Sequence, residues 1–177
     1  MTTLKMSLPT KSLVIPVGLP GSGKSTLLRG IEERYGLAGF RYGADDVRKT
    51  MFGDVSTQGN PALVHGAARA MLEVRMAEGL PSTYDATNLT LKARRPLIEL
   101  CGKYEYTAVL LMARISYDTA QSRNRGREEG RVPGHVLDRM NRQLNDGEWK
   151  KACQQGRSGI PYFFDEDTTD IEVDWLA

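Results

Sequence analysis

Eight residues near the start of the chain constrain its fold more than any other feature. Residues 18–25 read Gly-Leu-Pro-Gly-Ser-Gly-Lys-Ser, with two glycines five positions apart followed by lysine and a hydroxyl residue. Small residues at this spacing let backbone N–H groups curl around a phosphate, the lysine neutralises phosphate oxygens, and the serine hydroxyl can ligate Mg²⁺. The motif therefore predicts a loop that holds the phosphates of a nucleoside triphosphate.

The residues on both sides of the motif fit a strand, a loop and a helix in that order. The apolar run 13–17 predicts a buried strand, although Pro16 donates no ladder hydrogen bond, and 25–35 predicts a helix. A phosphate-binding loop requires this setting. The residues expected to bind ATP are Gly18, Pro20, Gly21, Ser22, Gly23, Lys24, Ser25 and Thr26, with Lys24 also catalytic and Ser25 a ligand of Mg²⁺.

Length and composition favour one domain with a substantial core. The chain has 177 residues, of which 40% are hydrophobic and 26% charged. Its longest apolar stretches, near 13–19 and 108–113, are far shorter than the roughly 20 residues of a membrane-spanning helix, so no membrane association is expected. Cys101 and Cys153 have no clustered partners, which argues against a disulfide scaffold or a zinc site and favours a reducing cytoplasm.

Strand and helix patterns alternate along most of the chain. This alternation predicts an α/β fold in which a parallel β-sheet carries helices on both faces. Residues 1–11 are expected to be a flexible lead, 12–147 the phosphate-loop domain, and 148–177 an extension with an acidic tail, joined by a linker at 154–159. The expected helices are 25–35, 45–51, 61–78, 91–103, 116–128 and 133–144, and the further strands are 39–42, 81–84 and 104–113.

Polar residues that follow the expected strands are candidates for the site, because ligands of such sheets gather at the carboxyl ends of the strands. Asp45 and Arg48 follow the second strand and lie three residues apart, on one face if a helix begins there. The carboxylate could take the proton of an attacking hydroxyl while the arginine grips an acceptor phosphate. A helix cap with a surface salt bridge would give the same pattern.

A second candidate segment, 85–88, follows the strand at 81–84. Asp85 could hold Mg²⁺, as acidic residues beside a phosphate loop commonly do, and Thr87 and Asn88 form the turn after it. Asp85, Thr87 and Asn88 are therefore candidate substrate contacts. Asn88 or Thr90 could equally cap the helix that follows, so Asn88 is expected to be partly structural.

The net charge of +2 conceals an uneven distribution. Arginines crowd residues 114–142, whereas the tail after residue 164 is acidic. Two short helices joined by the arginine-rich and glycine-rich loop within 116–133 could close over the nucleotide as a lid that excludes water. Several arginines of this segment, Arg123 and Arg127 among them, are candidates to contact the phosphates and to stabilise the charge of the transferring group. A solvated basic helix face would have the same composition.

Together these segments resemble the kinase domain of the T4-type 5′-polynucleotide kinases, within the small P-loop kinases. The resemblance covers about residues 12–144. It implies that Asp45 is the general base toward a 5′-hydroxyl, that Arg48 contacts an acceptor phosphate, and that Arg127 is the lid arginine. The segments that carry it are 17–26, Asp45-Asp46-Val47-Arg48, Asp85-Ala86-Thr87-Asn88-Leu89, and Arg123 to Arg127 with Val132-Pro133 and Val136-Leu137.

The resemblance implies transfer of the ATP γ-phosphoryl group to 5′-hydroxyl ends of DNA or RNA, in repair of nucleic-acid ends. A separate ligase or phosphatase would then complete the repair. Where the family allows Ser-Asp-Thr-Asn, this chain has Asp85 one position earlier. Two other functions stay open: a kinase of a nucleoside, a metabolite or a nucleotide sugar, and a regulatory ATPase that signals to a partner. The sequence leaves the choice between DNA and RNA, and the oligomeric state, undecided.

Overall fold

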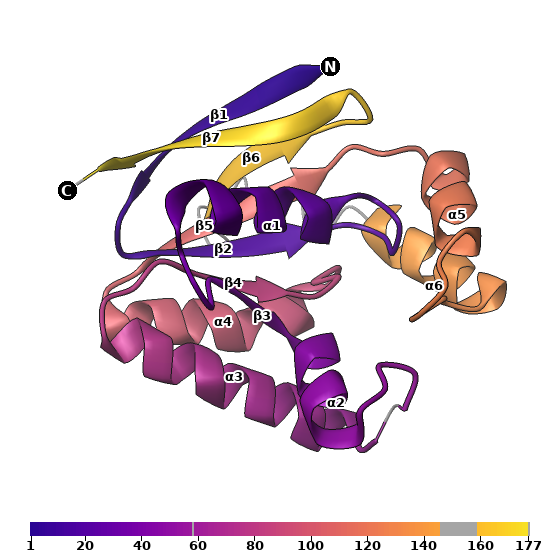
Figure 1. Cartoon of the computed structure of the whole chain (residues 1–177), viewed down its shortest axis with the longest axis horizontal. Coiled ribbons are helices and arrows are strands. Elements are labelled where there is room, and N and C mark those ends of the chain that lie inside the picture. Colours follow the sequence, from indigo (N-terminus) through magenta and orange to yellow (C-terminus); the bar gives the residue numbers. More distant parts are fainter. Residues whose placement is uncertain (58, 146–158, 177) are drawn as a thin grey trace.

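A five-stranded parallel sheet forms the centre of the fold (Figure 1). The computed structural model describes residues 1–57, 59–145 and 159–176. The strand order is β3-β4-β2-β5-β6, so the strand before the phosphate loop, β2, lies in the middle. The strands of this sheet are β2 (Ser12–Val17), β3 (Arg41–Gly43), β4 (Ser82–Asp85), β5 (Thr107–Ala113) and β6 (Ile160–Phe164). The expected parallel α/β architecture is confirmed.

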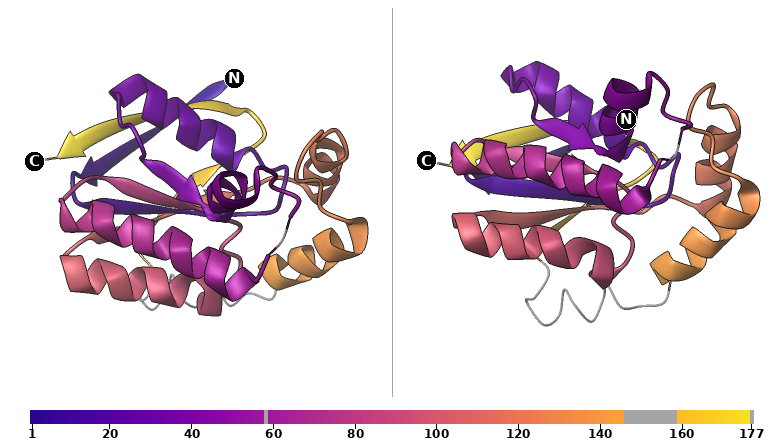
Figure 2. Two further views of the ribbon diagram at one scale, coloured as in Figure 1. Left: turned by 60° about the horizontal axis from the view of Figure 1, so that its bottom comes forward. Right: turned by 90° about the horizontal axis from the view of Figure 1, so that it is seen from below.

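Helices cover both faces of this sheet, as Figure 2 shows from two further directions. One face packs on α3 and α4, and the other packs on α1. The helices α5 and α6 stand together beyond one end of the sheet (Figure 1). The helices are α1 (Lys24–Tyr35), α2 (Ala44–Phe52), α3 (Pro61–Ala77), α4 (Leu91–Tyr104), α5 (Tyr117–Arg125) and α6 (Gly134–Asn145). Every expected helix is present, with its ends displaced by a few residues at most.

The central strand β2 is buried along its whole length, which is why it reads as a continuous apolar run. Leu13 and Ile15 belong to the core beneath α3 and α4, whereas Val14 belongs to the core beneath α1. Pro16 is tolerated because the pairing of β2 with β4 ends at Val14. Its carbonyl instead accepts a hydrogen bond from the amide of Asn88 at 2.9 Å.

The amino-terminal segment is a strand, so the expected flexible lead over residues 1–11 is wrong. Strand β1 (Thr2–Pro9) pairs in parallel with β7 (Thr168–Leu176) to form a second, two-stranded sheet. Figure 1 shows this pair of strands beside α1. The two strands are more than 150 residues apart in the sequence. Met6 and Leu8 point into the core while Lys5 and Ser7 are exposed. This period-two alternation was the missed signal.

The carboxyl-terminal segment is also part of the fold and not an appendage. Strand β6 pairs with β5 as the edge of the main sheet, and β7 then continues into the second sheet. Along β7, the buried residues Ile171 and Val173 alternate with the exposed residues Glu172 and Asp174. The acidic residues of the tail therefore occupy the solvent face of a strand. The expected linker lies outside the described residues, apart from Gly159.

We expect Leu8→Ala to destabilise the protein by about 3 kcal/mol, because Leu8 is fully buried and its loss leaves a cavity under α1. Chemical denaturation followed by circular dichroism measures this change. Ser7→Ala on the exposed side of the same strand is the matched control and should change stability by less than about 0.5 kcal/mol. Equal stability of the two variants would show that β1 contributes no packing.

Within the described residues, no helix is long and apolar enough to cross a membrane.

Candidate active site

The phosphate loop leaves the carboxyl end of β2 and leads directly into α1. Gly18, Gly21 and Gly23 have positive φ angles, which glycine adopts without strain. A Cβ atom on Gly21 would lie 2.3 Å from the carbonyl oxygen of Ala120 in α5. Glycine at this position therefore allows the loop to pack closely against the first helix of the arginine-rich region.

Lys24 is the buried cation of this loop. Its Nζ donates hydrogen bonds to the carbonyl oxygen of Leu19 at 2.7 Å and to the Ser22 hydroxyl at 3.0 Å. Burial lowers the pKa of Lys24 to about 8, an effect that Asp85 opposes and Arg127 reinforces. The ammonium group is still mostly charged at pH 7, so it can neutralise an anion at the loop.

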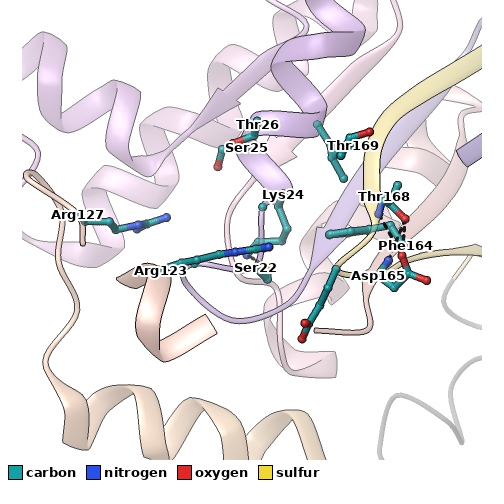
Figure 3. Close-up of a pocket in the computed structure, with 14 residues that line it drawn as sticks. Ser22, Lys24, Ser25, Thr26, Arg123, Arg127, Phe164, Asp165, Thr168 and Thr169 are labelled. Carbon is teal, nitrogen blue, oxygen red and sulfur yellow. Dashed lines mark hydrogen bonds between the residues drawn. The ribbon is translucent and has the colours of Figure 1, made fainter. Parts of the chain in front are cut away.

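A cavity of about 420 Å³ opens over the loop and the first turn of α1 (Figure 3). Arg123 from α5 and Arg127 from the following loop reach it from the opposite side to α1. The third wall comes from the turn between β6 and β7. The lining residues are Gly21 to Leu27, Arg123, Arg127, Phe164, Asp165, Glu166, Thr168 and Thr169. Of the expected ATP contacts, Gly18 and Pro20 are in the loop without lining the cavity.

Sequence reasoning missed the wall formed by residues 164–169. Asp165 orders this turn, since its Oδ1 accepts hydrogen bonds from the backbone N–H and the hydroxyl of Thr168. Glu166 accepts a hydrogen bond from the backbone N–H of Ser116, the N-cap residue of α5, at 2.8 Å. The turn is thereby joined to the base of the arginine-bearing helix. The polar cluster after an apolar run was the available signal for this turn.

The arginines of the 114–142 segment have different roles in the structure. Arg123 and Arg127 face the cavity, whereas Arg125 bonds to Gln121 on its own helix. Asn124 is buried, and its side chain exchanges two hydrogen bonds with the backbone of Val132. This residue fixes the loop after α5, which positions Arg127. The helix expected to reach residue 128 ends at Arg125.

The segment that contains Asp45 and Arg48 follows the carboxyl end of β3. Asp45 stands in the first turn of α2, its side chain is 72% exposed, and its Oδ1 accepts a hydrogen bond from Arg48 at 2.8 Å. The Arg48 side chain is only 10% exposed. A buried arginine thus holds an accessible carboxylate at the same edge of the sheet as the phosphate loop. The expected spacing on one helix face is confirmed.

Arg41, which the sequence did not single out, connects two carboxylates at this edge. Its guanidinium group contacts Asp46 at 3.2 Å and Asp85 at 3.1 Å. Asp46 also accepts a hydrogen bond from the backbone N–H of Gly43. A Cβ atom on Gly43 would lie 2.1 Å from the carbonyl oxygen of Asp85, so glycine allows β3 to approach β4 closely. These contacts fix the position of Asp85 relative to α2.

The turn after β4 is joined by hydrogen bonds to the end of β2 and to the start of the phosphate loop. Asn88 is buried at 4% exposure, and its amide nitrogen donates to the backbone carbonyls of Pro16, Tyr84 and Ala86. The carbonyl oxygen of Thr87 accepts a hydrogen bond from the N–H of Gly18 at 3.1 Å. Asn88 therefore has the structural part of its expected role, while Thr90 caps α4. Contact of Thr87 and Asn88 with a substrate stays a prediction.

The donor groups at the loop fit Mg²⁺, a hard cation that prefers oxygen ligands. The Ser25 hydroxyl lines the cavity, and the charge of Asp85 acts on neighbouring Lys24. Among the described residues, Asp85 uses only Oδ2 in a hydrogen bond, to Arg41, which leaves Oδ1 available. The described residues contain no cluster of three or more His, Cys, Asp or Glu side chains that could hold a metal by itself. Mg²⁺ at this loop would therefore depend on substrate phosphates for further ligands.

The fold and the loop define a P-loop domain of the α/β class, with a parallel sheet, a phosphate loop after its central strand and helices on both faces. The profile of the AAA_33 family, described as an AAA domain, matches residues 13–146. Because this match covers well over half of the sequence, the chain belongs to that family. A search of curated protein sequences gave no match.

Solved structures with a similar fold come from several different proteins. One is a chain of the Pnkp1/Rnl/Hen1 RNA repair complex, with a TM-score of 0.65 and 21% identity over 82% of this chain and 46% of that chain. A sugar kinase from Janibacter has a TM-score of 0.58 and 18% identity over 88% and 85% of the two chains. The AvrRxo1-ORF1:-ORF2 complex with ATP has a TM-score of 0.66 and 12% identity over 89% and 55%. Our chain thus spans about half of the length of the repair-complex chain.

Proposed function

We propose that this protein transfers the γ-phosphoryl group of ATP to the 5′-hydroxyl end of a DNA or RNA strand. The observation that carries the proposal is the Asp45–Arg48 ion pair, which lies at the same edge of the sheet as the phosphate loop. It supplies an accessible carboxylate for a hydroxyl proton and a buried cation for an adjacent anion. A nucleotide-binding site without phosphoryl transfer would need neither group in this position.

In the proposed reaction, the cavity over the loop holds ATP with its phosphates against Lys24 and the backbone N–H groups of the loop. The turn 164–169 forms the wall available to the nucleoside. Asp45 accepts the proton of the acceptor hydroxyl, whose oxygen attacks the γ-phosphorus in line. The bond to the bridging β–γ oxygen breaks, and ADP leaves with that electron pair. Arg127 stabilises the charge of the transferring group.

Ser25 and Asp85 would hold Mg²⁺, which supplies positive charge against the triphosphate. Arg123 lies along the loop in Figure 3, close enough that a Cβ atom on Gly23 would be 3.9 Å from its Nη1. We infer that Arg123 binds the nucleotide phosphates that Lys24 does not reach. Arg123 would then contribute to nucleotide binding and Arg127 to catalysis.

A polynucleotide acceptor is favoured by the surplus of arginine in 114–142 and by the similarity to a chain of an RNA repair complex. That complex also contains other proteins, so we include a separate ligase or phosphatase among the proposed partners. The similarity to a sugar kinase supports a second candidate, a kinase of a small acceptor. A regulatory ATPase is a third, and it would bind a partner in a nucleotide-dependent manner without any phosphoryl acceptor.

Incubation with γ-labelled ATP, Mg²⁺ and a panel of acceptors tests the proposal. The panel contains 5′-hydroxyl DNA and RNA oligonucleotides, 5′-phosphorylated versions of the same oligonucleotides, nucleosides and sugars. We expect label on the 5′-hydroxyl oligonucleotides only. Label on a sugar or nucleoside, with none on oligonucleotides, would establish the second candidate in place of the first.

We expect Arg127→Ala to lower kcat about a hundredfold with little change in the KM for ATP, because its charge acts on the transferring group. Arg123→Ala should instead raise the KM for ATP by about tenfold. Arg125→Ala is the matched control, since this residue lies on the same helix and bonds to Gln121. Steady-state kinetics with saturating acceptor measure both constants, and the opposite pattern would exchange the two roles.

A further inference from the structure

The outer side of helix α3 is apolar although it faces solvent, and Figure 2 shows this helix on the outside of the molecule. Leu63 is 71% exposed and Val74 is 70% exposed. A surface helix that packs only on its own domain normally has polar residues on its solvent side. The exposed residues of this side, which we call the outer seam, are Leu63, Ala67, Ala70, Val74 and Ala77.

The spacing of the outer seam is that of a contact between two helices. Its residues follow one another at steps of four, three, four and three positions, which is the 3.5-residue period of a helix packed along another helix. The opposite side of α3 packs into the core of the domain through Val64, Ala68, Leu72 and Met76. Helix α3 therefore has one apolar side for its own domain and a second apolar side for another helix.

A groove of about 360 Å³ lies beside the carboxyl half of the outer seam. It is lined by α3 and by the edge strand β3, and its wall includes the exposed side chains of Met71, Val74 and Leu80. Leu63 lies at the other end of α3 and projects into solvent outside this groove. One chain thus carries a projecting apolar side chain and an apolar groove at opposite ends of the same helix.

The sizes of the seam residues are self-complementary about Ala70. Leu63 and Ala77 lie seven residues on either side of it, and Ala67 and Val74 lie three and four residues on either side. In an antiparallel pair of α3 helices centred on Ala70, each large side chain would meet a small one, which allows close packing. Leu63 of one copy would lie beside Ala77 and the groove of the other copy, and twofold symmetry would repeat the contact.

The charges beside the outer seam favour the same arrangement. The seam residues are uncharged, and Glu73 and Glu78 lie next to them toward the carboxyl end of α3. A parallel pair of helices would bring each glutamate close to its own copy, which is repulsive. In the antiparallel pair, Glu78 would instead lie beside the first turn of the partner helix, where the helix dipole attracts a carboxylate.

We propose that a second copy of this chain covers the outer seam, so that the protein forms an antiparallel, twofold-symmetric dimer centred on Ala70. One helix pair and the two grooves make a small interface, below the roughly 1,200 Å² that most stable complexes bury. The dimer should therefore be reversible, with a Kd of about 10 µM. Among the described residues, those that line the cavity over the phosphate loop include none from α3, so dimerisation should not alter ATP binding.

Sedimentation velocity of the full chain tests the dimer. Because association follows mass action, we expect a shift from monomer to dimer between about 1 and 200 µM, with its midpoint near 10 µM. A monomer at every concentration would overturn the proposal and leave the outer seam to a different protein. The same measurement with added ATP should give the same midpoint.

Ala70→Glu should raise the Kd of the dimer at least tenfold, because it places two carboxylates face to face at the twofold axis. Ala93→Glu, at an exposed alanine of α4, is the matched control and should leave the Kd unchanged. Leu63→Ala should raise the Kd about tenfold by removing the side chain that enters the groove. This residue is exposed in the single chain, so the variant retains its fold and keeps the test valid if Ala70→Glu unfolds. Dimerisation of both seam variants with the normal Kd would show that the interface lies elsewhere.

Chemical crosslinking tests the antiparallel orientation, using variants with Cys153→Ser to remove one of the two native thiols. Ala70→Cys should give a covalent dimer with a short bismaleimide, since the two copies of position 70 meet at the twofold axis. Ala77→Cys should give none, because the two copies of position 77 would lie fourteen residues apart along the seam, or about 21 Å. Efficient crosslinking of both variants would indicate a parallel pair and overturn the antiparallel dimer, and crosslinking of neither would overturn the seam contact.

The dimer does not depend on the proposed reaction. Sedimentation and crosslinking require neither ATP nor an acceptor, so a failed phosphoryl-transfer assay leaves their results unchanged. If Ala70→Glu is monomeric and transfers phosphate at the normal rate, both the dimer and the independence of the two active sites are established.

Discussion

Asp45→Asn should lower the rate of phosphoryl transfer about a thousandfold while ATP affinity stays within about twofold of normal. Asparagine keeps the shape of the side chain but cannot accept the acceptor proton, and general bases contribute roughly 10²–10⁴ in rate. Asp45 is not among the residues that line the cavity over the phosphate loop, so ATP binding should not depend on it. Single-turnover transfer and equilibrium binding of a fluorescent ATP analogue measure the two quantities.

The control for this substitution is Asp174→Asn, which removes the same charge from an exposed position on β7. It should leave both rate and affinity unchanged. A collapse of ATP affinity in Asp45→Asn would make Asp45 a metal or structural residue. Its contact with Arg48 makes one further measurement useful, since Arg48→Lys should raise the KM for the acceptor more than it lowers kcat.

Lys24→Met should abolish ATP binding and, at the same time, stabilise the nucleotide-free protein at pH 7. Burial lowers the pKa of Lys24 from 10.5 to about 8. A depression of this size corresponds to a cost of about 3 kcal/mol for keeping the ammonium group charged in the folded protein. Methionine removes this cost but also the hydrogen bonds to Leu19 and Ser22, which offset part of the gain. We expect a net gain of about 1 kcal/mol or more.

The sign of the pH effect follows from the direction of the shift. The unfolded chain binds the Lys24 proton more tightly than the folded protein, so the stability contributed by this group rises as the pH increases from about 8 toward 10.5. Below pH 8 the full cost is present. The affinity for ATP changes with pH in the opposite direction, because a neutral Lys24 side chain no longer attracts phosphate. ATP affinity should therefore fall as the pH rises above 8.

Thermal unfolding at pH 7 checks the stability prediction, where a gain of 1 kcal/mol corresponds to a rise in Tm of roughly 2–4 °C for a chain of this size. Lys92→Met, at an exposed position on α4, is the control and should leave Tm and ATP binding unchanged. A lower Tm for Lys24→Met would show that the hydrogen bonds of Lys24 outweigh its desolvation. ATP affinity that stays constant between pH 7 and 9.5 would contradict the pKa of about 8.

Local patterns predicted much of the fold because each depends on neighbouring residues. The buried strand β2 follows from five consecutive apolar or near-apolar residues, and α3 follows from the apolar stripe with Asn60 and Pro61 at its start. Strand β1 was missed although Met6 and Leu8 alternate with polar residues. Its partner lies more than 150 residues away, and no local pattern identifies such a partner.

The candidate site, too, could be predicted from the sequence only in part. The phosphate loop and the Asp45–Arg48 spacing can be read from short segments, since the chemistry requires fixed residue types at fixed intervals. The contact of Arg41 with both Asp46 and Asp85 could not be predicted, because it needs β3 and β4 side by side. The arginine-rich segment suggested several candidates, and only the positions of Arg123 and Arg127 at the cavity distinguish them.

The sequence alone determined that this protein has a phosphate loop between a buried strand and a helix, because that chemistry is encoded in eight consecutive residues. The tertiary structure decided what faces the loop. It placed the turn 164–169 on the third wall of the cavity and brought Arg41 of β3 into contact with both Asp46 and Asp85. These contacts depend on sheet order and helix packing, which are collective properties of distant segments, so no single segment encodes them.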